Sequence, residues 1–307
     1  MPNIKVSVQA APGDLDSWLA LARRLESAGF HALVMGDHPG SGASPWPALG
    51  SAAAVTRTLR LGTCVAQAGV REPMHVAADA ATLDILAPGR VLLGIGAGHT
   101  PREWEDIGRR RAAPGERARR LAEFVDAVAR LLSGETVTCE GPRLALRGSR
   151  LESLPAGGRV SLMVGGGHPQ VLRAAARRAD VVGLSGLGQT LPDGHHHKVR
   201  WSAADLQRQL QLVRDEAQLA GNTPVIEALV QTVTLTEHRA ASIEQISRQI
   251  PGASAQDVAR TPFLLIGTYQ QMAAQLLAQA EDYGITSYVV REPAIAHLEQ
   301  VLPMLRG

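Results

Sequence analysis

The sequence predicts a single (β/α)8 barrel, on three observations. Apolar runs of strand length alternate with helical patterns along the whole chain, and close to eight such strands are present. The strands are near-continuous apolar runs, which is typical of parallel sheets covered on both faces. The chain has 307 residues, of which 45% are hydrophobic, and one barrel typically needs roughly 250 residues. Residues 1–307 are therefore expected to form one domain.

The first strand and helix carry clear signals. Residues 4–8 alternate with period two, as a strand does, and an apolar pattern from Leu15 to Leu25 follows with the i, i+3, i+4, i+7 spacing of an amphipathic helix. Gly29 ends this helix. The turn between the two elements, residues 9–14, contains no G-x-G-x-x-G. A Rossmann-type sheet is therefore the less favoured alternative.

The later units repeat this rhythm. Strands are expected at residues 32–35, 59–65, 90–95, 160–164, 180–184, 225–235 and 287–290, and helices at 47–55, 76–86, 116–132, 169–178, 203–220 and 268–284, with a closing helix after the last strand. Thr268 and Gln271 have the spacing of a capping box at the start of the helix that Gly284 ends.

Two segments interrupt the alternation. Residues 135–158 contain two short strand-like runs around a Gly-Pro turn and predict a hairpin insertion. Residues 186–200 predict a long loop after the sixth strand. Loops of more than about 12 to 15 residues in a compact domain are more often functional than accidental. The hairpin is expected as an insertion in the barrel, and the long loop is expected at the carboxyl ends of the strands.

Composition and charge exclude several classes of function. The net charge is +2, no long run of one sign occurs, and aromatic residues make up 3% of the chain, so nucleic-acid binding is not expected. No apolar run approaches the roughly 18 to 20 residues that cross a bilayer. Because the N-terminus alternates like a strand rather than a signal peptide, a cytoplasmic protein is predicted. Cys64 and Cys139 are expected to be free thiols.

A glycine triplet near the middle of the chain is a candidate phosphate site. Gly165, Gly166 and Gly167, with His168, close an apolar run and open a helical pattern. Such a turn presents backbone N–H groups and the positive end of a helix dipole, which suit a phosphate monoester. The triplet also fits an ordinary tight turn, because it lacks the spacing of a dinucleotide fingerprint or a P-loop.

The carboxyl ends of the predicted strands should carry the chemistry. These ends are Gln9, Asp37 with His38, Val65 with Gln67, Gly96 to His99, Gly165 to His168, and Ser185. Among them Asp37–His38 is the best candidate for proton transfer, because a carboxylate beside an imidazole can fix its tautomer and move its pKa. An equally weighted alternative is that the pair only caps the turn into Pro39.

The segments around these strand ends resemble a known family. They match the luciferase-like monooxygenase superfamily, and more narrowly its coenzyme F420-dependent oxidoreductase branch, in order and spacing at residues 34–38, 59–65, 71–73, 80–98, 162–167, 175–183, 261–268 and 283–290. The stretch 82–98 is the most specific of these. The resemblance runs from the first strand to the last.

The resemblance implies that the strand ends hold a flavin-like ring, with the cofactor phosphate on the turn at Gly165 to His168. It also implies a cis, non-prolyl peptide between Cys64 and Val65 that backs the ring. The cofactor-binding residues expected on this basis are Asp37, Cys64, Val65, Gly96, Ala97, Gly98, Gly165, Gly166, Gly167, His168 and Ser185.

The resemblance further assigns catalytic roles. His38 carries over as the acid or base beside the reactive carbon, and Asp37 either orients it or contacts the ring. Many relatives have tryptophan or glutamate where this chain has His99. His99 is therefore interpreted either as a second proton donor or as a residue that only shapes the pocket. Trp46 either lines the substrate side or packs under its loop.

The triplet His195–His197 does not predict a metal site. Contiguous histidines point in different directions and lack the i, i+4 spacing of a zinc site. Together with Lys198 and Arg200 the triplet could close over the phosphodiester and acidic oligoglutamate tail of the cofactor. An equally weighted alternative is a solvated loop tip.

The resemblance therefore favours a coenzyme F420-dependent oxidoreductase, expected to be an F420H2-dependent reductase, that moves hydride between the deazaflavin and a small substrate such as an imine, enone, activated alkene or alcohol. The alternative is an FMN-dependent two-component monooxygenase of the same fold. A third reading is a cofactor-binding protein without turnover. A homodimer is expected because relatives are commonly dimers, and a flavin or F420 reductase is a candidate protein partner.

Overall fold

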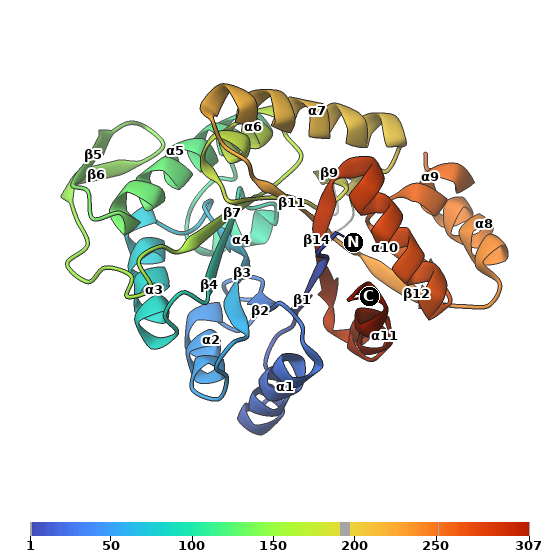
Figure 1. The fold of residues 1–307 in the computed structure, drawn as a ribbon. Helices are drawn as coiled ribbons and strands as arrows, with labels where there is room; N and C mark the ends of the chain where they lie inside the picture. Colours follow the sequence, from blue (N-terminus) through green and yellow to red (C-terminus); the bar gives the residue numbers. More distant parts are fainter. Residues whose placement is uncertain (1, 191–196, 251, 307) are drawn as a thin grey trace.

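The computed structural model describes residues 2–190, 197–250 and 252–306. Eight parallel strands close into a barrel in the order β1, β14, β11, β8, β7, β4, β3, β2 (Figure 1). The barrel strands are β1 (Lys5–Gln9), β2 (Ala32–Met35), β3 (Arg60–Gln67), β4 (Val91–Gly96), β7 (Ser161–Gly165), β8 (Val181–Leu184), β11 (Val225–Leu229) and β14 (Ile285–Arg291). The predicted (β/α)8 barrel is confirmed.

Helices surround the barrel (Figure 1). They are α1 (Leu15–Ala28), α2 (Pro45–Ala53), α3 (Pro73–Leu86), α4 (Pro101–Asp106), α5 (Pro114–Leu132), α6 (Pro169–Arg178), α7 (Ala203–Ala220), α8 (Arg239–Gln249), α9 (Ala255–Arg260), α10 (Tyr269–Tyr283) and α11 (Ile295–Val301), with short 3-10 turns η1 (Glu292–Ala294) and η2 (Leu302–Leu305) on either side of α11. The predicted capping box of Thr268 and Gln271 starts α10, and Gly29 ends α1 in the left-handed conformation. None of the helices in the described ranges is long and apolar enough to cross a membrane.

The main apolar core lies between the barrel strands and the helices. Inside the barrel the packing depends on small residues. Gly94 and Gly183 face Met163, and a Cβ atom on either glycine would lie 3.0 Å from that side chain. The side chain of Met163 therefore fills the space that the two glycines leave open inside the barrel.

One predicted strand is wrong. Residues 225–235 form two strands in different sheets, because β11 belongs to the barrel whereas β12 (Thr232–Leu235) pairs with β13 (Leu264–Gly267) outside it. The chain changes partner between them: Val230 N donates to Val289 O at 2.8 Å, and Gln231 N donates to Phe263 O at 2.8 Å. Because the apolar pattern continues from β11 into β12, it does not show that the chain moves to another sheet.

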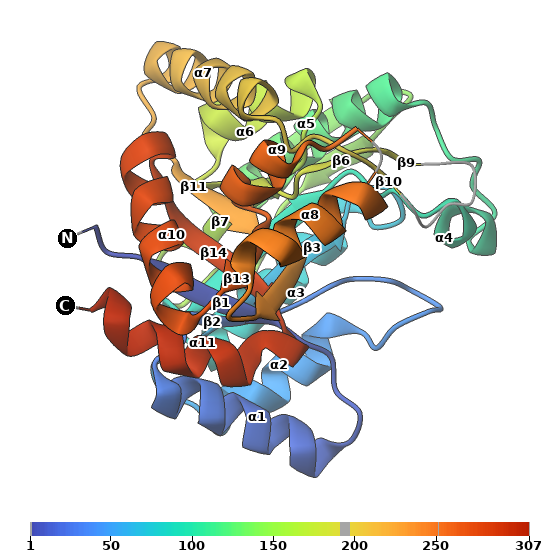
Figure 2. The same cartoon turned by 90° about the vertical axis from the view of Figure 1, so that its right-hand side faces the viewer.

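The two interruptions lie in different parts of the molecule. The predicted hairpin is present as β5 (Val137–Glu140) and β6 (Ala145–Ser149), an antiparallel pair at the edge of the molecule in Figure 1. The segment 186–200 is not simply a loop, since β9 (Leu187–Thr190) and β10 (His197–Val199) pair antiparallel. His195 and His196 lie outside the described residues. Figure 2 shows α4, β9 and β10 at one end of the barrel and both chain termini at the other.

Candidate active site

A bulge in β3 forms the centre of the site. The register between β3 and β4 shifts between Thr63 and Ala66, and the peptide between Cys64 and Val65 is cis, as the family resemblance predicts. The side-chain amide of Gln9 donates to the carbonyl oxygen of Cys64. The bulge is therefore held from the neighbouring part of the barrel as well as by its own strand.

The glycines at the ends of β4 and β7 make room for this bulge. A Cβ atom on Gly96 would lie 2.5 Å from Cγ2 of Val65, and one on Gly165 would lie 3.3 Å from Cγ1. Gly98 has a φ of 76° and lies against Gln67, where a Cβ atom would approach the side-chain oxygen to 2.6 Å. These residues leave Val65 only partly buried. The result is an apolar platform bordered by backbone, which fits one face of a flat ring.

His38 forms the most specific polar contact of the site. Its Nδ1 lies 2.7 Å from Oε1 of Glu103, whose side chain is 2% exposed, whereas the side chain of His38 is 45% exposed. The amide of Gln67 donates to the second carboxylate oxygen. Within the described residues, Nε2 of His38 has no hydrogen bond. One ring nitrogen is thus fixed by a buried carboxylate and the other is available to a substrate.

This contact sets the protonation of the pair. The hydrogen bond to Glu103 raises the pKa of His38, burial opposes this, and the charges of Glu103 and Asp37 raise the pKa further. Burial alone would raise the pKa of Glu103, but the hydrogen bonds from His38 and Gln67 hold it below its usual value. An imidazolium beside a carboxylate is therefore favoured, which suits a proton donor.

Asp37 has a different role from its neighbour. It is 2% exposed, and Arg71 donates to both of its oxygens, at 2.7 Å and 3.1 Å. The backbone N–H of Gln67 donates to Oδ2 at 3.2 Å. Asp37 therefore ties the end of β2 to the segment after β3, and it acts on His38 through its charge rather than through a hydrogen bond.

His99 lies at the same end of the barrel. It is exposed, and its ring is 6.0 Å from that of His38 between centroids, at an interplanar angle of 84°. The structure thus brings together the two histidines that the sequence singled out. The role of His99 as a second proton donor stays a prediction. Trp46 is partly buried and packs against the apolar core, and its contact with the substrate stays a prediction.

The glycine turn lies at the start of α6. His168 is the N-cap residue, and its Nδ1 accepts a hydrogen bond of 3.2 Å from Gln170 N. Arg200 donates to the carbonyl oxygen of Gly167 at 3.1 Å. Burial lowers the pKa of His168, and the charges of Arg200, Arg117 and Arg119 lower it further. The turn is therefore surrounded by cations, as a phosphate site requires.

Two other residues predicted to contact the cofactor, Lys198 and Ser185, make no hydrogen bond to this turn among the described residues. Lys198 is exposed on β10, and within the described residues its side chain makes no hydrogen bond or ion pair. Ser185 bonds locally, since its hydroxyl accepts from Leu187 N at 3.3 Å. Of the residues that the structure describes, no group of three or more histidines, cysteines or acids is arranged to hold a metal ion.

Sequence reasoning missed several residues of the site. Glu103 lies on α4, a helix too short to give a periodic pattern, and its only signal is an acid four positions after His99. Arg111 and Arg117 precede or begin α5, and Nε of each is buried without a hydrogen bond. Burial and the charge of Arg111 lower the pKa of Arg117 to about 10. These arginines were hidden by the abundance of arginine in the whole chain.

Comparisons with known proteins identify the family and the fold. The profile of the luciferase-like monooxygenase family matches residues 2–287. A 4-hydroxyprotoasukamycin monooxygenase of Streptomyces nodosus subsp. asukaensis is 38% identical over 158 residues, 47% of this chain and 42% of that protein. An F420-dependent glucose-6-phosphate dehydrogenase of Beutenbergia cavernae is 35% identical over 202 residues, 60% and 56% of the two chains. These matches span about half of the length of the relatives.

Solved structures show the same fold. An F420-dependent secondary alcohol dehydrogenase, in complex with an F420-acetone adduct, aligns over 99% of this chain and 100% of its own with a TM-score of 0.77 and 18% identity. Because the family model matches residues 2–287, nearly the whole chain, the chain belongs to the luciferase-like monooxygenase family.

Proposed function

We propose that this protein is a coenzyme F420-dependent oxidoreductase that acts as an F420H2-dependent reductase on a small organic substrate such as an imine, an enone, an activated alkene or a ketone. The choice of F420 rests on the resemblance to F420-dependent relatives such as the 35% identical glucose-6-phosphate dehydrogenase. The observation that carries the reduction chemistry is the His38–Glu103 pair. It lies at the carboxyl ends of the strands, beside the Val65 bulge, and it favours a protonated imidazole with a free Nε2. Reduction by hydride needs such a proton donor.

The residues around the bulge fit the proposed cofactor. Val65 with Gly96 and Gly165 would lie against its ring, and the turn at Gly167 and His168, with Arg200, would hold its phosphate. Arg117 adds a cation beside that turn. When bound, the deazaflavin supplies hydride to an electrophilic carbon and does not readily activate oxygen.

The protein side of the mechanism is then a proton transfer. Nε2 of His38 donates a proton to the nitrogen or oxygen atom that gains negative charge as the substrate is reduced. Glu103 stabilises the imidazolium before transfer and keeps Nδ1 protonated afterwards, so the ring stays in one tautomer. Gln67 holds Glu103 in place. In the opposite direction the neutral imidazole accepts the proton of an alcohol.

A second candidate is an FMN-dependent monooxygenase. It is favoured by the 38% identity to the 4-hydroxyprotoasukamycin monooxygenase and by the agreement in fold with an EDTA monooxygenase, at a TM-score of 0.75. In that case the same platform would hold the isoalloxazine ring. The His38–Glu103 pair can act as a proton donor in either enzyme. The choice of cofactor is therefore the property to measure.

Parallel titrations of the purified protein with coenzyme F420 and with FMN, each oxidised and reduced and followed by ring fluorescence, test the proposal. We expect coenzyme F420 to bind at least about tenfold more tightly than FMN, which corresponds to about 1.4 kcal/mol. We also expect F420H2 to be oxidised anaerobically by at least one compound in a panel of imines, enones and ketones. Tighter binding of FMN, with oxygen-dependent turnover, would replace the proposal by the second candidate.

A further inference from the structure

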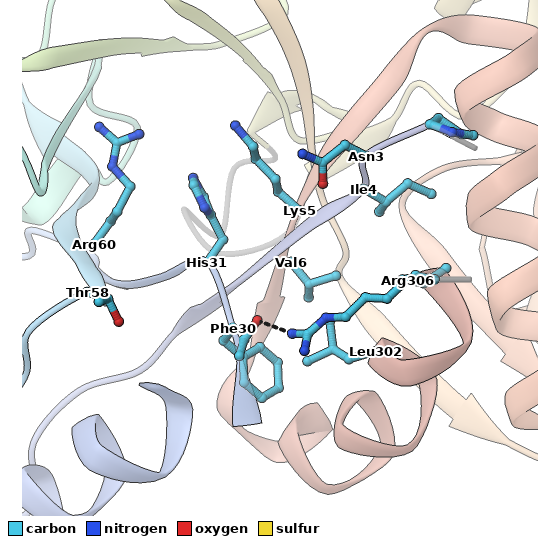
Figure 3. A pocket seen from close by; sticks show the side chains of 13 residues that line it. Asn3, Ile4, Lys5, Val6, Phe30, His31, Thr58, Arg60, Leu302 and Arg306 are labelled. Atoms are coloured by element: carbon cyan, nitrogen blue, oxygen red, sulfur yellow. Dashed lines mark hydrogen bonds between the residues drawn. The ribbon is translucent and has the colours of Figure 1, made fainter. Parts of the chain in front are cut away.

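A pocket at the amino-terminal end of the barrel is lined by four basic side chains, three of them at the starts of strands and the fourth Arg306. It has a volume of about 830 Å³ and lies where β1, β2 and β3 begin. Lys5 starts β1, His31 directly precedes β2, and Arg60 starts β3. Figure 3 shows their nitrogen-bearing ends pointing to the same side. This amino-end pocket is at the opposite end of the strands from His38.

The backbone fixes these three residues as neighbours. His31 N donates to Val6 O at 2.7 Å, and Arg60 N donates to His31 O at 3.2 Å. The three residues therefore lie next to one another where β1, β2 and β3 begin. Lys5 and Arg60 belong to strands of the closed barrel, and His31 is held to both strands by its backbone hydrogen bonds.

The cationic groups of the pocket lack counter-charges. Within residues 2–190, 197–250 and 252–306, the side chains of Lys5, His31 and Arg60 make no hydrogen bond or ion pair, and Nε of Arg60 is buried. None of the described residues that line the pocket is acidic. Asp180 attracts Arg60 at longer range, but its carboxylate is bonded to Arg159 at 2.7 Å and to Leu162 N at 2.8 Å.

This crowding has an electrostatic consequence. Burial, together with the charges of Lys5 and Arg60, lowers the pKa of His31 to about 4. Burial also lowers the pKa of Arg60. At neutral pH His31 is therefore neutral, and the positive charge of the pocket comes from the lysine and arginine side chains that line it. A bound anion would offset the repulsion and the cost of burial at the same time.

The remaining walls limit what this anion can be. Asn3 and Thr58 add polar atoms, and Phe30, Leu302 and Leu305 add an apolar side. Arg306 lies across β1 in Figure 3, and its guanidinium is already engaged by the carbonyl oxygen of Gly29 at 2.8 Å. The pocket therefore suits a small molecule with one strongly charged end and a compact body.

We propose that the amino-end pocket is a second binding site, separate from the active site, for a small metabolite that carries a phosphate group or several carboxylates. The planar guanidinium of Arg60 suits two oxygens of such a group, and Lys5 adds a compact charge beside it. His31 contributes a ring nitrogen that can donate to a third oxygen.

Histidine NMR resonances and calorimetry test this site with inorganic phosphate, pyrophosphate and citrate as probes. We expect saturable binding of at least one probe that shifts the His31 resonance, assigned with His31→Asn, and that raises the pKa of His31 against Lys5, Arg60, Arg306 and Asp180 as its charged neighbours. Phosphate and pyrophosphate binding without citrate would assign a phosphate ligand. The reverse would assign a polycarboxylate.

Variants locate the binding. Lys5→Met and Arg60→Met should each weaken it by about tenfold or more. Arg147→Met is the matched control, because that side chain is 85% exposed on the distant hairpin. Arg200→Met separates the two anion sites, since it should leave the response of His31 unchanged. The proposal is overturned if no probe binds saturably, or if Lys5→Met and Arg60→Met both bind as the wild type does.

Discussion

The two ends of the barrel differ in whether their charged side chains are paired. At the carboxyl end every described buried acid of the site has partners: Glu103 accepts from His38 and Gln67, and Asp37 accepts from Arg71. At the amino end Lys5 and Arg60 stand together without a counter-charge. Paired charges fix a proton donor in one state before substrate arrives. Unpaired charges of one sign are stabilised most by a bound ligand of the opposite charge.

The largest effect should come from the donor itself. We expect His38→Ala to lower kcat/KM for F420H2-dependent reduction by about 10² to 10⁴-fold, because general acid catalysis contributes that much. Cofactor affinity, measured by ring fluorescence, should stay within about twofold, since the ring contacts assigned to Val65 and the glycines are untouched. His75→Ala on the exposed face of α3 is the control. Full activity of His38→Ala would remove His38 from the mechanism.

The second effect concerns stability at the carboxyl end. Arg71→Met leaves the carboxylate of Asp37, which is 2% exposed, without its ion pair. We expect it to lower the free energy of unfolding by about 3 kcal/mol, as breaking a buried pair does. Arg24→Met is the control, because Arg24 is 51% exposed in its pair with Glu299, and should cost less than about 1 kcal/mol. Both are measured by urea denaturation.

A double variant sharpens this comparison. Asp37→Asn combined with Arg71→Met removes the stranded charge, so it should recover much of the loss seen with Arg71→Met alone. Equal losses in the single and double variants would mean that Arg71 stabilises the fold by packing and not by pairing with Asp37.

Sequence reasoning predicted the barrel because alternation of period two and period 3.6 is a local property of the chain. The helix from Ala203 to Ala220 and the capping box before α10 are read correctly for that reason. The division of residues 225–235 between two sheets was missed, because a change of hydrogen-bonding partner leaves no trace in apolar periodicity.

The site also contains residues that the sequence predicted and residues that it did not. His38, His99 and the glycine turn follow predicted strand ends, so topology alone brings them together. Glu103 and Arg71 were missed because they reach the site from helix α4 and from the segment after β3, at distances along the chain that no motif encodes. Lys5, His31 and Arg60 lie 26 or more positions apart and become neighbours only when the ladder forms.

A smaller effect should appear in the pH profile. Glu103→Gln removes the group that raises the pKa of His38 most. The pKa of His38 should therefore fall. Because the protonated ring is the donor, the loss of reductase activity with rising pH should begin at a lower pH than in the wild type. At neutral pH we expect a loss on the order of tenfold, part of the whole acid contribution. The measurement is kcat/KM against pH, together with the NMR titration of His38. An alkaline limb that does not move would show that Glu103 only packs there.

The smallest effect should come from the amino end, and its sign is the informative part. Lys5→Met removes one of two neighbouring unpaired cations, so in a buffer without multivalent anions we expect stability to stay within about 0.5 kcal/mol of the wild type or to rise. Adding pyrophosphate should then stabilise the wild type by mass action and the variant much less, so that the order reverses. Thermal unfolding with and without pyrophosphate measures both. A loss of several kcal/mol in Lys5→Met without any anion would mean that Lys5 already has a partner, and the contrast between the two ends would fail.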